Sequence, residues 1–231
     1  MATMDLQVKE GVHVLTLTNG DNDNKFNLDV IHEYLAAFDA VEEYKGNTAL
    51  MITCEHEKTF TTGIDLAWMM AQSPEGVAKF RHALETMLYR LAMLNAPTLM
   101  CINGNAYAGG ALLFAATDFN FMRSDRGRIC YPEVDIKIPF TPSMYDLIDN
   151  IPNKLLLKRM SLLGERVSSQ DAFDAGILDA IHPAHKLQEK SFEFAKELAK
   201  KDRKAYTVIK HGLKRHMLKW QDEFGQKLTA E

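Results

Sequence analysis

Two short, continuous apolar runs constrain the fold of this chain most. The first is Ala49–Thr53, and the second is Thr98–Ile102, which directly follows Pro97. Runs of this length are typical of strands that are buried on both faces of a sheet. The pattern between them predicts a helix over 77–94, and Phe119–Met122 predicts a further strand. This alternation of strands and helices favours an α/β layered fold over a helical bundle or a β-sandwich.

The segments on either side continue the alternation. Val12–Leu17 is a predicted strand, and the apolar residues of 28–44 have helical spacing, with acidic residues between them. Further on, Ser168–Asp171 has the spacing of a capping box, and Gly176 is placed to end the short helix that follows. We expect one more short strand at Leu178–Ile181.

The length of the chain indicates a single core. A chain of 231 residues, 46% of them hydrophobic, is long enough to bury one substantial core. After His182-Pro183 the pattern is mostly helical. We therefore expect a core domain over residues 1–186 and a C-terminal helical segment over 187–231.

Neither a membrane span nor a targeting signal is indicated by the sequence. No window approaches eighteen consecutive apolar residues, and the first residues are too polar for the apolar core of a signal peptide. The last residues, KLTAE, differ from the SKL-type peroxisomal signal. We expect a soluble, cytoplasmic protein without a membrane partner.

Cysteine and histidine spacing argues against a metal site. Cys54, Cys101 and Cys130 are odd in number and far apart, so we expect three small buried side chains rather than disulfides or zinc ligands. The histidine pairs at 182/185 and 211/216 have no acidic or cysteine ligand at a suitable spacing. We expect no metal.

Charge is distributed unevenly along the chain. The formal net charge is −4, yet residues 196–219 hold nine Lys/Arg and only two acids, Glu197 and Asp202. This segment is either a solvated helical face or a positively charged surface that attracts the phosphates of an anionic ligand. RNA is a weaker third interpretation, because no RNA-binding motif accompanies these charges, so a nucleic-acid partner is not expected.

Two glycine-containing loops carry the strongest functional signal. Phe60–Leu66 and Asn103–Ala111 each follow an apolar strand and precede helical sequence. Amides at the start of a helix have no partner within the helix, so they bind anionic oxygen well. Two such sets that converge would form an oxyanion hole. A single loop of this kind is weak evidence, since glycine often serves only a turn or close packing.

The two loops together resemble the crotonase (enoyl-CoA hydratase/isomerase) superfamily. The first is similar to its Phe-Ser/Ala-Ala/Asn-Gly-x-Asp-Leu/Ile pattern and the second to its Asn-Gly-x-Ala-x-Gly-Gly-Gly, in family order, and the resemblance spans roughly residues 6–185. It implies an α/β crotonase-like (ClpP/crotonase) fold: a spiral of ββα units in two roughly perpendicular sheets, with C-terminal oligomerisation helices. Family members form homotrimers or hexamers.

The resemblance also implies an acyl-CoA site. The backbone N–H groups of Thr62 and Gly109 match the two that hold the thioester oxygen in the family, and Glu133 matches a catalytic glutamate. Other positions match residues around the substrate: Gly63, Ile64, Asp65, Leu66 and Leu112. Coenzyme A is then part of the substrate, and no separate cofactor is expected. Asp65 has an alternative interpretation as a carboxylate at a helix N-terminus.

The sequence departs from the hydratase pattern at Leu112, where hydratases have a second glutamate. Hydration shares its proton transfers between two carboxylates, whereas double-bond migration needs one base. The motifs around residues 60–68 and 121–136 are similar to those of plant-type enoyl-CoA delta isomerases. We therefore expect 3-enoyl-CoA to be isomerised to 2-enoyl-CoA, in fatty acid metabolism, by Glu133 alone. Asp135 is a secondary candidate, which would face the same side as Glu133 in an extended segment.

Three alternative functions remain open. The chain is a hydratase that works with one glutamate, a catalytically silent homologue that binds acyl-CoA, or a silent homologue that binds RNA. Ile138–Pro142 replaces a glycine-rich stretch of hydratases and is expected to line the acyl pocket. The basic segment 196–219 is a candidate to contact the 3′-phosphate of CoA bound in a neighbouring subunit.

Overall fold

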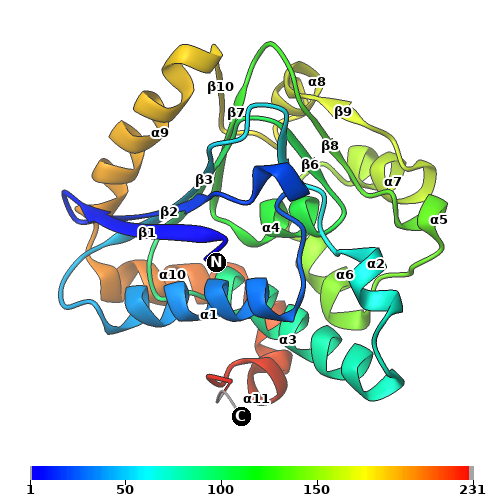
Figure 1. Cartoon of the computed structure of the whole chain (residues 1–231). Helices are drawn as coiled ribbons and strands as arrows, with labels where there is room; N and C mark the ends of the chain where they lie inside the picture. Colours follow the sequence, from blue (N-terminus) through cyan, green and yellow to red (C-terminus); the bar gives the residue numbers. More distant parts are fainter. Residues whose placement is uncertain (1, 229–231) are drawn as a thin grey trace.

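The larger of two sheets forms the centre of the molecule (Figure 1). The structure, a computed structural model, describes residues 2–228. The sheet has six strands, in spatial order β1 (Met4–Lys9), β2 (Val12–Leu17), β3 (Ala49–Cys54), β5 (Thr98–Ile102), β7 (Phe119–Arg123) and β10 (Ala180–His182). Among the described strands of this sheet, β1 and β2 pair antiparallel and the other neighbours pair parallel. All strands expected from the apolar runs are present. The additional strand β1 is a mostly exposed edge strand, which explains its weak apolar pattern.

The first three strands of the smaller sheet alternate along the chain with strands of the larger sheet. Its strands, in spatial order, are β4 (Thr59–Thr61), β6 (Asn105–Tyr107), β8 (Arg128–Cys130) and β9 (Val167–Ser168). Each of β4, β6 and β8 follows a strand of the larger sheet after a short turn and precedes helical sequence. These are the ββα units that the predicted crotonase fold requires, so the fold prediction is confirmed.

Helices occupy the connections between the strands. Those before β10 are α1 (Leu28–Glu43), α2 (Leu66–Met70), α3 (Pro74–Ala92), α4 (Gly109–Ala116), α5 (Glu133–Ile136), α6 (Pro142–Ile148), α7 (Lys154–Leu163) and α8 (Ser169–Asp174), with a 3₁₀ turn η1 (Gly20–Asn22). The C-terminal ones are α9 (Ala184–Ala199), α10 (Arg203–Leu213), η2 (Arg215–Trp220) and α11 (Gln221–Phe224). The predicted capping of α8 is present: Ser168 Oγ accepts from the Asp171 N–H at 3.1 Å, and Gly176 adopts φ +69° beyond its end.

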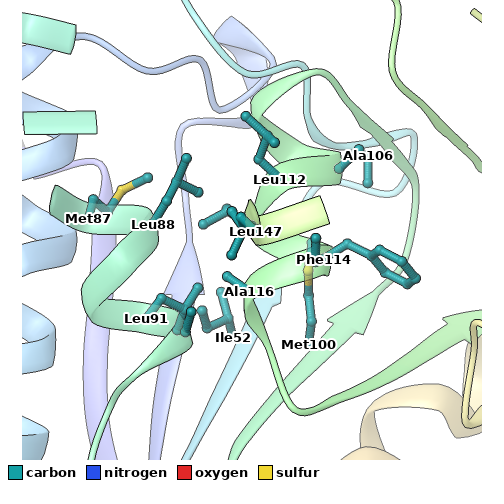
Figure 2. Close-up of a cluster of buried hydrophobic side chains, with 14 of the residues drawn as sticks. Ile52, Met87, Leu88, Leu91, Met100, Ala106, Leu112, Phe114, Ala116 and Leu147 are labelled. Atoms are coloured by element: carbon teal, nitrogen blue, oxygen red, sulfur yellow. The ribbon is translucent and has the colours of Figure 1, made fainter. Parts of the chain in front are cut away.

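The main hydrophobic core lies between one face of the larger sheet and helices α1, α3 and α4. Figure 2 shows part of it, where Ile52 of β3 and Leu91 of α3 lie near Ala116 of α4. All eight residues of α4 are buried. This packing holds the first turn of α4, which begins with the second glycine-containing loop, in one place. The three cysteines are buried, as predicted: Cys54, Cys101 and Cys130.

The C-terminal helices pack on this core. Helix α9 covers the opposite face of the larger sheet (Figure 1), where its Leu187 and Leu198 belong to one buried cluster with side chains of β2, β3 and β5. Met217 of η2 and Phe224 of α11 belong to the main core. The predicted boundary after residue 186 and the oligomerisation role of 187–231 stay predictions. No helix within residues 2–228 is long and apolar enough to cross a membrane.

Many cations of the basic segment 196–219 have partners inside the chain. Six of its nine Lys/Arg make ion pairs or hydrogen bonds with other described residues: Lys196, Lys200, Arg203, Lys210, Lys214 and Lys219. The Lys210 and Lys214 ammonium groups both lie 2.9 Å from the buried Asp118 carboxylate. Burial alone would raise the pKa of Asp118, but the two lysines outweigh it and hold the pKa below its usual value. These contacts favour a structural role for much of the segment.

Candidate active site

A largely apolar cavity of about 640 Å³ lies between the two glycine-containing loops, α3, α5 and the segment that leads into α6. Its lining residues are Thr62, Ile64, Leu66, Met69, Val77, Phe80, Arg81, Leu84, Tyr107, Ala108, Gly109, Leu112, Pro132, Glu133, Ile136, Ile138, Pro139, Phe140, Thr141 and Met144. A second cavity, of about 670 Å³, borders Asp118 and Lys210 and includes none of the predicted site residues. The first cavity is therefore the candidate active site.

The two loops meet at a pair of glycines. Parallel pairing of β4 with β6 places their ends next to each other, with Thr61 opposite Ala106. Gly63 adopts φ +79°, and a Cβ on it would lie 2.4 Å from the Gly109 nitrogen. A Cβ on Gly109 would lie 2.6 Å from the Phe26 ring. Both positions therefore require glycine, and the two loops lie in contact at this point.

The backbone amides of the two loops differ. Among residues 2–228, none accepts a hydrogen bond from the Gly109 N–H, which belongs to the first turn of the buried helix α4. The Thr62 N–H, in contrast, donates to the Asp23 carbonyl at 3.2 Å. The next amide, of Gly63, donates to Thr61 Oγ1 at 3.0 Å. A free amide is therefore present at Gly109 but not at Thr62, whose backbone contact with a thioester oxygen stays a prediction.

Glu133 is the first residue of α5, and its side chain lines the cavity. The residue is 8% exposed, and its Oε2 atom is buried without a hydrogen-bond partner among the described residues. Burial raises its pKa to about 7, although a hydrogen bond from its own backbone N–H opposes this shift. A carboxylate with a pKa near the working pH is suited both to accept a proton and to return it.

Asp135 does not share this position. The prediction that it faces the same side as Glu133 assumed an extended segment, but residues 133–136 form the short helix α5. Two residues along a helix, side chains point about 200° apart. Asp135 is accordingly exposed, lies against Gly164 and does not line the cavity. The prediction for Asp135 was wrong because it applied the period of a strand.

The other predicted substrate contacts separate into two groups. Ile64, Leu66 and Leu112 line the cavity, whereas Gly63 and Asp65 do not. The Asp65 side chain instead caps α2, accepting from the Trp68 N–H at 3.1 Å, which is the alternative interpretation of this residue. Four residues of the predicted acyl-pocket segment also line the cavity: Ile138, Pro139, Phe140 and Thr141. Their binding of substrate stays a prediction.

Two features of the site were missed from the sequence. Helix α3 contributes Val77, Phe80 and Leu84, whose spacing of three and four residues marks a helical face that could have been read as a pocket wall. The second is the side chain of Thr62, because only its backbone was considered. Its Oγ1 atom is buried without a hydrogen-bond partner among the described residues, in a residue that lines the cavity.

The fold is that of the crotonase family, and comparison with known proteins agrees. The family model for enoyl-CoA hydratase/isomerase matches residues 7–228. The chain therefore belongs to the enoyl-CoA hydratase/isomerase family, the crotonase family expected from the two loops.

Individual relatives include both isomerases and hydratases. Enoyl-CoA delta isomerase 2, peroxisomal, from Arabidopsis thaliana is 30% identical over 181 residues, which cover 76% of this chain and 75% of that protein. Enoyl-CoA delta isomerase 3 from the same plant is 27% identical with the same coverage.

Solved structures match over nearly the whole chain. Human mitochondrial delta3-delta2-enoyl-CoA isomerase has a TM-score of 0.86 at 21% identity and covers 96% of this chain and 88% of its own. An enoyl-CoA hydratase from Mycobacterium ulcerans has a TM-score of 0.87 at 18% identity and covers 97% of both chains. At these identities the structural matches show the fold alone.

Proposed function

We propose that this protein isomerises 3-enoyl-CoA to 2-enoyl-CoA with Glu133 as its single base. One observation carries the proposal: among the described residues that line the cavity, Glu133 is the only carboxylate. The resemblance to hydratases, which implies that Leu112 matches the position of their second glutamate, supports the same reaction. The names of the two plant relatives support the same reaction.

The proposed reaction moves one proton. The ionised Glu133 removes a proton from C2 of the 3-enoyl thioester, and the electron pair delocalises as a dienolate with negative charge on the thioester oxygen. In the proposed reaction, the Gly109 N–H, which has no hydrogen-bond partner among the described residues, donates to this oxygen. Glu133, now protonated, returns the proton to C4, which leaves the double bond between C2 and C3. A positioned base contributes about 10²–10⁴ in rate, and each oxyanion donor about 10²–10³.

Hydration is disfavoured by the same lining. Addition of water to a 2-enoyl thioester requires a positioned water and a proton delivered to C2, which hydratases of the family divide between two carboxylates. Leu112 is only 3% exposed and offers no acceptor for such a water. An apolar cavity also keeps the proton on Glu133 from exchanging with solvent while it moves from C2 to C4.

The test compares two reactions and three proteins. Turnover of a 3-enoyl-CoA and hydration of crotonyl-CoA are measured for the wild type, Glu133→Gln and Asp135→Asn. Asp135→Asn is the matched control, because it removes an exposed carboxylate two residues away that does not line the cavity. We expect isomerisation to fall at least about 10²-fold in Glu133→Gln and to stay unchanged in Asp135→Asn.

Other outcomes would contradict the proposal. Isomerisation that survives in Glu133→Gln would place the base elsewhere. Hydration of crotonyl-CoA as the main wild-type activity would favour the one-glutamate hydratase. Retained CoA-thioester binding without turnover would indicate a silent binder.

We also propose that the protein assembles as the family does, into a homotrimer or hexamer. Several apolar side chains of α7 and α10 are more than 60% exposed in the single chain: Leu155, Leu162, Leu163, Val208, Ile209 and Leu213. Interfaces between identical subunits bury apolar side chains such as these. Sedimentation of the protein as a monomer at micromolar concentration would exclude this assembly.

A further inference from the structure

Glu85 is a buried carboxylate close to the cavity that has no role in the proposed reaction. It lies in α3 beside Leu84, which lines the cavity, and the residue is only 9% exposed. A buried carboxylate destabilises the folded chain unless hydrogen bonds or a cation compensate for its lost hydration. The groups that bond to Glu85 therefore indicate what this side chain holds in place.

Two hydroxyl groups at the start of α6 bond to this carboxylate. Glu85 Oε1 accepts hydrogen bonds from Thr141 Oγ1 at 2.5 Å and from Ser143 Oγ at 2.6 Å. Distances this short are typical of a hydroxyl that donates to an ionised carboxylate. Thr141 is also the N-cap of α6, where its Oγ1 accepts from the Met144 N–H at 3.4 Å. One oxygen atom of α3 thus holds the first turn of α6 at two points.

The turn that this carboxylate holds belongs to the cavity wall. Thr141 and Met144 line the cavity, together with Phe140 directly before them. Residues 137–141, which lead into the turn, form neither helix nor strand. At the other end of α6, Leu147 is buried in the main core. Apolar packing therefore anchors the end of α6, and the hydrogen bonds to α3 anchor its start, which faces the cavity.

The start of α6 and α3 supply apolar wall beyond the reacting atoms. In the proposed reaction, Glu133 and the Gly109 N–H act on C2, C4 and the thioester oxygen. Acyl carbons beyond C4 take no part in the chemistry, and apolar surroundings favour their binding. The cavity offers such surroundings through Phe80 and Leu84 of α3 and Met144 of α6.

We propose that Glu85 is a positioning residue, which holds the wall for acyl carbons beyond C4 and makes the site selective for acyl chains longer than four carbons. It acts through Thr141 and Ser143 and touches no reacting atom. A wall that is already fixed loses little conformational entropy when a chain binds, so contacts with further methylene groups increase affinity. The inference rests on the proposed function for the orientation of the acyl group in the cavity.

Binding of saturated acyl-CoAs tests this role without any turnover. Isothermal titration calorimetry gives the Kd of butanoyl-CoA and of decanoyl-CoA for the wild type, Glu85→Met and Glu75→Gln. Methionine has a similar length but no oxygen acceptor. Glu75→Gln is the matched control, because Glu75 is an exposed glutamate of the same helix that does not line the cavity.

The expected effect depends on the length of the acyl chain. We expect the wild type to bind decanoyl-CoA more tightly than butanoyl-CoA. In Glu85→Met the Kd of decanoyl-CoA should rise about tenfold, which corresponds to lost contact with about two methylene groups, while the Kd of butanoyl-CoA stays within about twofold. Glu75→Gln should leave both Kd values unchanged.

Further variants test the hydrogen bonds themselves. Ser143→Ala removes one of the two without changing the cavity lining, and should weaken decanoyl-CoA binding about threefold. Combined with Glu85→Met it should add no further loss, because both residues act through one cluster. Glu85→Gln keeps an oxygen acceptor and should stay within about threefold of the wild type. If Glu85→Met does not unfold cooperatively in urea, Ser143→Ala carries the test.

Several outcomes would overturn the inference. They are an equal loss of affinity for both acyl-CoAs, unchanged decanoyl-CoA binding in Glu85→Met and in Ser143→Ala, and a wild type whose affinity does not depend on acyl length.

Turnover separates the inference from the proposed function. For 3-decenoyl-CoA, Glu85→Met should raise KM about tenfold and change kcat by less than about threefold. A length-dependent loss of affinity in a protein that does not isomerise 3-enoyl-CoA would refute the isomerase and leave the role of Glu85 intact. Wild-type isomerisation with unchanged KM in Glu85→Met would refute the role of Glu85 and leave the isomerase intact.

Discussion

Replacement of Glu133 by glutamine is expected to stabilise the folded protein at alkaline pH. Burial raises the pKa of this carboxyl from its ordinary value of 4.5 to about 7. Between these two values the folded state holds a proton that the unfolded state has released, so the stability of the wild type decreases as pH rises from about 4.5 to about 7. Glutamine is neutral at every pH and avoids this loss.

The size of the effect follows from the two pKa values. One pKa unit corresponds to about 1.4 kcal/mol, so the change from 4.5 to about 7 destabilises the ionised wild type by about 3 kcal/mol. The full difference is present above pH 7 and decreases to below about 1 kcal/mol at pH 5. For a chain of this length, about 3 kcal/mol corresponds to a rise in Tm of about 6–12 °C.

Urea and thermal unfolding of the wild type and Glu133→Gln at pH 8 and pH 5 measure this effect. Asp135→Asn is the control, because Asp135 is exposed and its replacement should leave stability nearly unchanged at both pH values. A stabilisation of Glu133→Gln that is equal at pH 8 and pH 5 would refute the reasoning, since a packing effect carries no such pH dependence. A wild type with a larger free energy of unfolding than Glu133→Gln at pH 8 would mean that the pKa of Glu133 is not raised.

Three further predictions test the site and the fold. In the wild type, kcat/KM for isomerisation should fall as pH decreases below about 7, because protonated Glu133 cannot accept the C2 proton; a flat profile from pH 5 to 8 would exclude it as the base. Leu112→Glu adds a second carboxylate to the cavity wall and should raise crotonyl-CoA hydration by about 10²-fold; no gain would argue that Leu112 is not what excludes hydration. Asp118→Asn leaves the buried Lys210 without its charged partner and should lower the free energy of unfolding by about 3–5 kcal/mol in urea titrations; a loss below about 1 kcal/mol would show that the pair contributes little.

Local sequence was sufficient for much of the fold. The continuous apolar runs at residues 49–53 and 98–102 became central strands, because a strand buried on both faces needs apolar side chains on both. The sequence also indicated that glycines in the two loops serve turns or close packing. The structure agrees, since positive φ at Gly63 and close approach at Gly109 exclude a Cβ. The edge strand β1 was not predicted, because its exposed faces leave little apolar pattern.

The sequence by itself determined the alternation of strands and helices, the two glycine-containing loops, and the presence of Glu133 together with Leu112. Tertiary structure decided which groups are available for chemistry. The Thr62 N–H donates to the carbonyl of Asp23, a residue thirty-nine positions earlier in the chain. Burial raises the pKa of Glu133, and the cavity wall that buries it is built from several segments far apart in the sequence. Hydrogen-bond partners and desolvation depend on residues that only the folded chain brings together, and no local pattern records them.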